Sequence, residues 1–91
     1  MPDGAFPPPS PVRRTFLIQA HRRGDIILRV LGPFVVQGSE ILAVEAHQEA
    51  DRTAIRVEAG GLAESAAQHL VERLREMPAV IGVGLGWRVE A

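Results

Sequence analysis

Cysteine, lysine, tyrosine and asparagine are all missing from this chain of 91 residues. Without cysteine, disulfides, thiolate metal sites and cysteine nucleophiles are excluded. Without lysine, Schiff-base chemistry and a P-loop phosphate site are excluded as well. The ten basic residues are therefore all arginine, and eleven acidic residues bring the formal charge to −1, which gives no electrostatic reason to expect nucleic acid.

Long apolar runs are also missing. No segment approaches the roughly 18 consecutive apolar residues of a transmembrane helix, and the N-terminus lacks the order of charges and apolar residues found in signal peptides. We therefore expect a cytoplasmic protein. Its length suits one small domain with a marginal core, so a partner chain is expected.

Proline is concentrated at the N-terminus. We expect residues 1–12 to form a disordered, polyproline-like tail and residues 13–91 to form the folded domain. The tail holds five of the seven prolines, which are Pro2, Pro7, Pro8, Pro9 and Pro11.

A strand, a short loop and a helix follow one another in the first part of this domain. Residues 13–21 are apolar and β-prone, which predicts a strand. Apolar residues at offsets of three and four then predict a helix whose buried face holds Ile27, Val30, Leu31 and Phe34.

The polar loop Arg22–Asp25 between them places an acid at the N-cap position of the helix. This loop is either a solvated turn or a contact for a ligand or partner, because unpaired N–H groups point outward at a helix N-terminus. Pro33 predicts a kink or early fraying, and Gly38 predicts a left-handed C-cap.

Four further elements are predicted beyond the first helix. Alternation places Ile55 and Val57 on one face of a strand and Arg56 and Glu58 on the other, facing water. The ranges are a strand at 39–48, a turn at 49–52, a strand at 53–59, a helix at 62–77 and a strand at 80–89.

The last two elements have clear faces. The helix at 62–77 is predicted to bury a stripe made of Ala63, Ala66, Leu70, Leu74 and Met77. The final strand is predicted to turn its apolar residues to the helices and a row of glycines to the other side. The apolar set is Ile81, Val83, Leu85 and Trp87, and the glycine row is Gly82, Gly84 and Gly86.

The element order strand–helix–strand–strand–helix–strand predicts an α+β, ferredoxin-like βαββαβ fold, in which a four-stranded antiparallel sheet carries both helices on one face. Right-handed crossovers place the first and third strands in the centre. The second strand is then an edge without lysine or proline to protect it. We expect a homodimer by edge pairing through Leu42, Val44 and Ala46.

No catalytic or metal-binding set is apparent. The histidines, His21, His47 and His69, fall on different elements, and no cysteine accompanies them. The glycine row lies within a strand that no helix follows, so it is not a dinucleotide fingerprint. The aromatic residues are too few for an RNA-binding sheet of this fold.

The chain resembles ACT domains, and in particular the small regulatory subunit of acetolactate (acetohydroxyacid) synthase of the short, single-domain type. The matching residues are Phe16–Ala20, the helix core Ile27-Leu28-Arg29-Val30-Leu31, Gly38, the stripe residues Leu70 and Leu74, and the segment Pro78-Ala79-Val80-Ile81-Gly82-Val83. The helix core corresponds to the family's Leu-x-Arg-Val-hydrophobic motif.

The resemblance implies a regulatory subunit without catalytic residues. Such a subunit binds and activates a larger enzyme of branched-chain amino acid biosynthesis, and no cofactor is expected in this chain. Thiamine diphosphate, Mg and FAD would belong to the catalytic partner.

The same resemblance places an effector or partner-contact site between the first loop of one chain and the start of the second strand of its neighbour. Its residues here would be Arg22, Arg23, Gly24, Asp25, Ile26, Glu40 and Ile41. The valine-sensitive pattern has Asn, Gly and Asn where this chain has Arg22, Asp25 and Glu40. We therefore expect an activating subunit that does not respond to valine.

Two other functions remain open at this point. The chain could be a free-standing ACT sensor of amino acids or a plain ferredoxin-like dimerisation module. The segment Gln68–Leu70 and the glycine row are both candidate docking surfaces for a partner.

Overall fold

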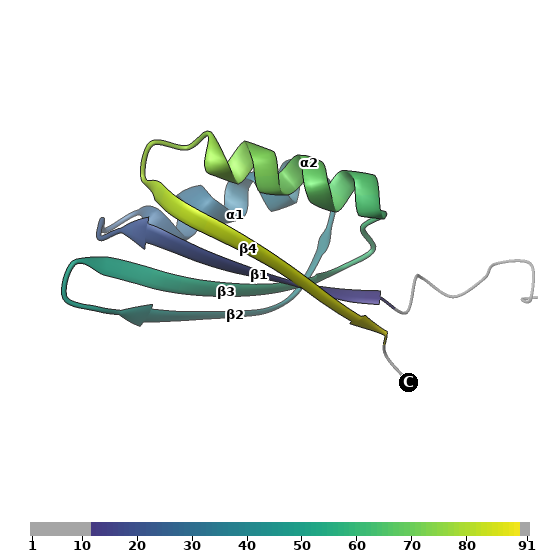
Figure 1. Ribbon diagram of the computed structural model, residues 1–91, viewed down its shortest axis with the longest axis horizontal. Coiled ribbons are helices and arrows are strands. Elements are labelled where there is room, and N and C mark those ends of the chain that lie inside the picture. Colours follow the sequence, from purple (N-terminus) through teal and green to yellow (C-terminus); the bar gives the residue numbers. More distant parts are fainter. Residues whose placement is uncertain (1–11, 90–91) are drawn as a thin grey trace, which may run out of the picture.

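The computed structural model describes residues 12–89, and the side chains of residues 13–86 (Figure 1). The proline-rich segment predicted as a disordered tail lies almost entirely outside the described residues, apart from Val12, which begins the first strand. The elements are β1 (Val12–His21), α1 (Ile26–Val36), β2 (Glu40–Gln48), β3 (Arg52–Gly60), α2 (Glu64–Arg75) and β4 (Val80–Val89).

The four strands form one antiparallel sheet in the order β2-β3-β1-β4, so β1 and β3 are central, as predicted. Both helices cover the same face of this sheet, and no helix of residues 12–89 lies on the other face (Figure 1). The ferredoxin-like βαββαβ fold is therefore confirmed. Neither helix is long and apolar enough to cross a membrane, among the residues described.

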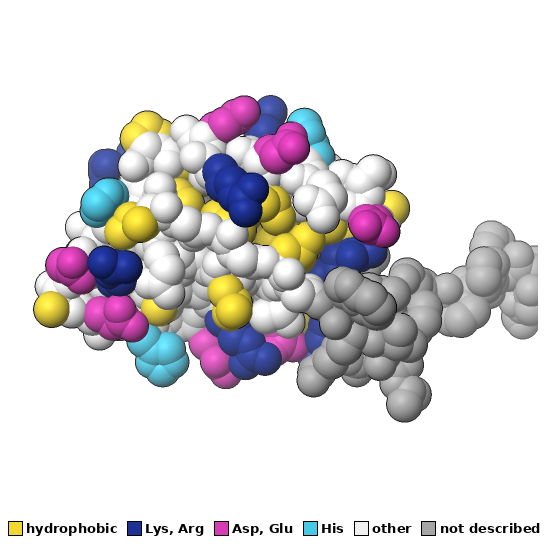
Figure 2. Space-filling model, in the orientation of Figure 1, with side chains coloured by type: hydrophobic (Ala, Val, Ile, Leu, Met, Phe, Trp, Pro, Cys, Tyr) yellow, Lys and Arg dark blue, Asp and Glu magenta, His cyan; other side chains and the backbone are white. Residues whose placement is uncertain are grey.

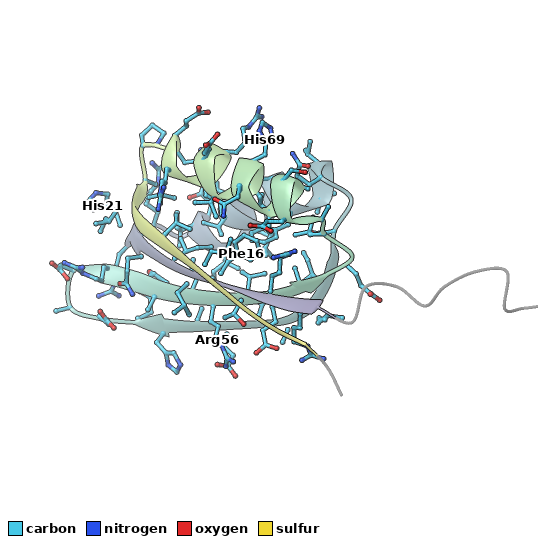
Figure 3. The ribbon with its side chains drawn as sticks, turned by 45° about the vertical axis from the view of Figure 1, so that its right-hand side comes forward. Phe16, His21, Arg56 and His69 are labelled. Carbon is cyan, nitrogen blue, oxygen red and sulfur yellow. The ribbon has the colours of Figure 1, made fainter. Side chains whose placement is uncertain are left out.

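The core lies between the helices and the covered face of the sheet. Phe16 and Phe34 meet there edge to face, with ring centroids 4.9 Å apart and an interplanar angle of 86°, and Figure 3 shows Phe16 beneath the helices. The other large apolar side chains with at most 2% exposure are Ile18, Ile26, Val30, Ile55, Val57, Leu70 and Leu74.

Helix α1 ends as its glycine predicts. Gly38 has φ +73°, its N–H donates to the carbonyl of Val35, and the N–H of Ser39 donates to the carbonyl of Phe34. These two bonds form a Schellman motif. Of the two outcomes expected at Pro33, a kink or early fraying, the fraying is wrong, because the helix runs past the proline to Val36 and its C-terminal closure holds the turn that follows.

Helix α2 is shorter than predicted and buries a different stripe. Ala63 has extended backbone (φ −68°, ψ 160°) at the N-cap position, and Met77 lies beyond the C-cap residue Glu76, so neither belongs to the helix. Ala66 and Met77 are only half-buried against the core. The buried residues are Ala67, Leu70, Val71 and Leu74.

One apolar residue of β4 does not face the helices as predicted. The pairing of β1 with β4 shifts between Gln19 and Ala20, so that Ala20 pairs with Val80 and leaves Ile81 as the extra residue. Ile81 is consequently 45% exposed, whereas Val83 and Leu85 pack against the core.

This difference is testable with a matched pair of variants. Ile18→Val removes a buried methylene from β1, so the free energy of unfolding should fall by about 1 kcal/mol. Ile81→Val makes the same change at the bulge and should alter it by less than about 0.5 kcal/mol. Urea denaturation of both variants measures the two values, and equal losses would contradict the bulged position of Ile81.

Candidate functional site

The loop between β1 and α1 borders an open hollow of about 290 Å³. Arg22, Arg23 and Gly24 line it together with Gln48, the last residue of β2. These elements meet because β1 and β2 both run antiparallel to β3, so their C-terminal ends lie at the same end of the sheet. The predicted loop therefore lies beside a space that is lined by two arginines.

Arg22 joins this loop to the turn between β2 and β3. Its Nη1 donates to the carbonyl oxygens of Glu49 and Ala50, at 3.3 and 3.5 Å. Both acceptors are neutral carbonyl groups. The two bonds therefore hold the guanidinium group in place without neutralising its charge.

Asp25 occupies the N-cap position of α1, but its side chain makes no capping hydrogen bond. Its carboxylate instead pairs with Arg29, one turn along the helix, and lies 3.6 Å from the Nε of Arg23. The hydrogen bond from Arg29 is the main reason why the pKa of Asp25 is lowered. The expected cap is thus replaced by an ion pair on the surface of the helix.

The remaining residues of the predicted site lie elsewhere in a single chain. Glu40 and Ile41 begin β2, at the opposite end of the sheet from Arg22, so one chain does not bring the two halves of the site together. Ile26 is 1% exposed and belongs to the core, and Ile41 is half-buried against it. A site that uses both halves needs a second chain.

The uncovered face of the sheet carries a row of alternating charges across three strands. Arg13 contacts Glu58 at 2.9 Å, Glu58 contacts Arg56 at 2.6 Å, and Arg56 lies 3.5 Å from Glu45. Figure 3 shows Arg56 pointing away from the helices, and Figure 2 shows arginine and carboxylate groups side by side along that side. The side chain of Glu58 is only 9% exposed, so its predicted exposure to water is wrong; the two arginines cover it.

A second hollow, of about 280 Å³, lies on the same face. The side chains around it include Leu17, Gln19, Glu45, His47 and Arg56. Leu17 is 53% exposed at its edge, so this hollow combines an apolar wall with charged groups.

The glycine row of β4 runs beside Leu17. A Cβ atom at Gly82 or Gly86 would meet no atom within 4 Å, and one at Gly84 would lie 4.0 Å from the Cβ of Leu17. Packing within the described part of the chain therefore does not require glycine at these positions. Glycine inside a strand also weakens it by roughly 0.5–1 kcal/mol relative to alanine.

The three histidines do not converge. Figure 3 shows His21 and His69 well apart, at an end of the sheet and on the outer side of α2. Within residues 12–89, no group of three or more His, Asp or Glu side chains is placed to hold a metal ion.

The sequence matches no protein-family model and no curated protein. Among solved structures, the ACT domain of a GTP pyrophosphokinase from Chlorobium tepidum has a TM-score of 0.71 at 11% identity, over 81% of this chain and 96% of that domain. The C-terminal domain of MgtC from Mycobacterium tuberculosis has a TM-score of 0.72 at 11% identity, over 94% and 96%.

A homoserine dehydrogenase from Thiobacillus denitrificans contains a similar unit, with a TM-score of 0.70 at 11% identity over 88% of this chain and 17% of the enzyme. The chain has the ACT-domain fold. In this ACT fold the loop at Arg22–Asp25 and the uncovered face of the sheet are two separate candidate surfaces.

The sequence alone identified the loop, but it did not reveal the charge row or the position of Gln48 beside the hollow. The alternation of Arg56 and Glu58 was visible, but their pairing with Glu45 and Arg13 depends on strand register. Gln48 was visible only as the end of a strand.

The ion pair at Asp25 makes a prediction about titration. Because the folded-state pKa is lowered, the pair stabilises the fold above the unfolded-state pKa, and this stabilisation is lost as pH falls through the folded-state value. Arg29→Gln should therefore raise the pKa of Asp25 toward its ordinary value, as measured by NMR titration of the carboxyl carbon.

Arg23→Gln is the matched control, because Arg23 lies at the longer distance of 3.6 Å and should have a smaller effect. An equal or larger rise in the pKa of Asp25 for Arg23→Gln would contradict Arg29 as its main partner.

Proposed function

We propose that this ACT-fold chain is a non-catalytic regulatory subunit that binds and activates the large, thiamine-diphosphate-dependent subunit of acetolactate synthase in the cytoplasm. The observation that carries the proposal is that the ACT fold accounts for all six described elements. The helix core Ile27–Leu31 and the segment Pro78–Val83, in which the resemblance to the small subunit lies, fall on α1 and at the start of β4.

The uncovered face of the sheet is the surface that we assign to the catalytic partner. Its glycine row leaves space that the chain's own described residues do not fill, which suits the close approach of another backbone. The exposed Leu17 beside it offers apolar area to bury, and the charge row gives the contact a polar border. The segment Gln68–Leu70 is less suitable, because Leu70 is fully buried.

We further propose that the subunit is a homodimer through β2 and that it does not respond to valine. Asp25 puts a carboxylate, held by Arg29, at the N-terminus of α1, where an incoming carboxylate would need free N–H groups. Thiamine diphosphate, Mg and FAD belong to the catalytic partner, in which the chemistry would take place.

A free-standing sensor of amino acids is the second candidate. The observation in its favour is the hollow lined by Arg22, Arg23 and Gln48, where a guanidinium group could take a ligand carboxylate. A sensor of this kind would bind its ligand without any synthase.

The proposed function is tested by mixing the purified chain with thiamine-diphosphate synthases from the same cell. The chain should co-purify with an acetolactate synthase and raise its turnover, and saturating valine should leave the raised turnover unchanged. Gly84→Thr should keep the fold, because a Cβ atom at this position meets only the Cβ of Leu17, at 4.0 Å, and threonine suits a strand, but the variant should lose at least about tenfold in affinity for the synthase.

Gly24→Ala is the matched control, since a Cβ there also meets nothing within 4 Å but lies in the β1–α1 loop. It should activate like the unmodified chain. Absence of any synthase from the co-purified material would overturn the function, whereas unchanged activation by Gly84→Thr would overturn only the docking face. Inhibition of the complex by valine would overturn the proposal that the subunit does not respond to valine.

A further inference from the structure

The row of β1 side chains that faces the helices begins with a charged residue. Arg14 precedes Phe16 and Ile18 on this face of the strand, and it is only 8% exposed. A guanidinium group is always charged in proteins, and burial of a charge is unfavourable unless an opposite charge is paired with it. An arginine at this position is therefore expected to have a negatively charged partner.

Arg14 has no such partner in the part of the chain that the structure describes. Its Nε donates to the carbonyl oxygen of Leu62 at 3.1 Å, which is a neutral acceptor, and no carboxylate of the described residues lies within ion-pair distance. The other buried charged residue in that range, Glu58, is held between Arg13 and Arg56. The two Nη groups of Arg14 are thus left without an acceptor among these residues.

The bond to Leu62 holds this guanidinium group beside the start of α2. Leu62 lies two residues before Glu64, the first residue of that helix, and Gly61 with φ +75° turns the chain from β3 toward it. Figure 1 shows the start of α2 and the start of β1 at the same end of the molecule. A buried cation and a helix N-terminus, which come from distant parts of the sequence, therefore lie together here.

The N-terminus of α2 is not capped by a side chain. Ala63 occupies the N-cap position, where it offers no side-chain acceptor, and no side-chain hydrogen bond caps the helix. The first bond of the helix runs from the N–H of Ala67 to the carbonyl of Ala63, at 2.9 Å. The N–H groups of residues 64–66 consequently have no partner inside the helix. Such N–H groups and the helix dipole both favour a negative charge at this point.

The charges around these donors favour a carboxylate over a phosphate. Because Nε of Arg14 is bound to Leu62, the guanidinium group offers its Nη1 and Nη2 fork, which matches the two oxygens of a carboxylate. Glu64 adds a negative charge in the first turn of the helix. This charge repels a dianion such as phosphate more strongly than a monoanion.

We propose that Arg14 and the N-terminus of α2 form a binding site for a small carboxylate, which the Nη groups of Arg14 and the N–H groups of residues 64–66 hold. The ligand supplies the anion that the buried guanidinium group needs, so its binding also stabilises the fold. The site lies at the opposite end of β1 from the Arg22–Asp25 loop, since that strand runs from Val12 to His21. It requires neither the synthase nor a second copy of the chain, and it is therefore independent of the proposed function.

NMR titration of the full chain with sodium acetate tests the site, with acetate replacing chloride at constant ionic strength and neutral pH. Acetate should shift the amide signals of Ser65 and Ala66 and the Nε–H signal of Arg14 along one saturation curve, because one ligand contacts both groups of donors. Inorganic phosphate, titrated in the same way, should bind more weakly. The absence of a saturable shift would overturn the site, and tighter binding of phosphate would overturn a carboxylate as its ligand.

Two arginine variants separate this site from a general attraction of anions to the surface. Arg14→Gln should weaken acetate binding at least about tenfold, because a charge-assisted hydrogen bond is lost. Arg75→Gln is the matched control: Arg75 also donates to a backbone carbonyl, that of Val83, but it is exposed, and the variant should bind acetate like the unmodified chain. Equal losses in the two variants would contradict a specific role of Arg14.

Ala63→Asp gives a second test that does not depend on the folding of Arg14→Gln. Ala63 is exposed and has φ −68° and ψ 160°, which suits an N-cap residue, so aspartate fits there without rearrangement. Its carboxylate would take the place of the ligand from within the chain. The variant should unfold at a higher temperature and should no longer show the acetate shift at Arg14. Acetate binding that persists in this variant with unchanged affinity would place the ligand elsewhere and overturn the site.

Discussion

Burial of one sheet face under two helices is the interaction on which the rest of this molecule depends. The side chains of Phe16, Ile18, Ile55 and Val57 fill that face and meet Phe34 from α1. Two helices are sufficient to cover one face of four strands, and the other face and the β2 edge are left open to additional contacts. A small domain built this way has a limited core, so covering those surfaces with other chains would add stability as well as function.

The architecture was predictable because its signals are local and repeated. Alternation in β3, helical spacing in both helices and the breaks at Gly38 and Pro78 fix the element order. Right-handed crossovers then fix the strand order without any knowledge of side-chain contacts. For the same reason, the loop at Arg22–Asp25 could be located at the end of β1 before its geometry was known.

Two of the details that were wrong depend on pairing between distant segments, whereas a third depends on a local choice of partner. Ile81 fits the alternating pattern of β4, but its exposure follows from a bulge opposite Gln19 and Ala20, which only the β1 register determines. Glu58 has the polarity of a water-facing residue, yet arginines from two strands cover it. Asp25 has the position of a cap, but Arg29 provides a stronger, charged partner for its carboxylate.

The central claim is that the β2 edge is covered in the functional molecule whereas the β4 edge is not. Amide hydrogen exchange of the free chain, measured residue by residue over a dilution series, tests it most directly. The account predicts that outward-facing amides of β2 are protected at high concentration and lose protection on dilution, while those of β4 exchange at one rate throughout. Outward amides of β2 that exchange rapidly at every concentration would contradict it.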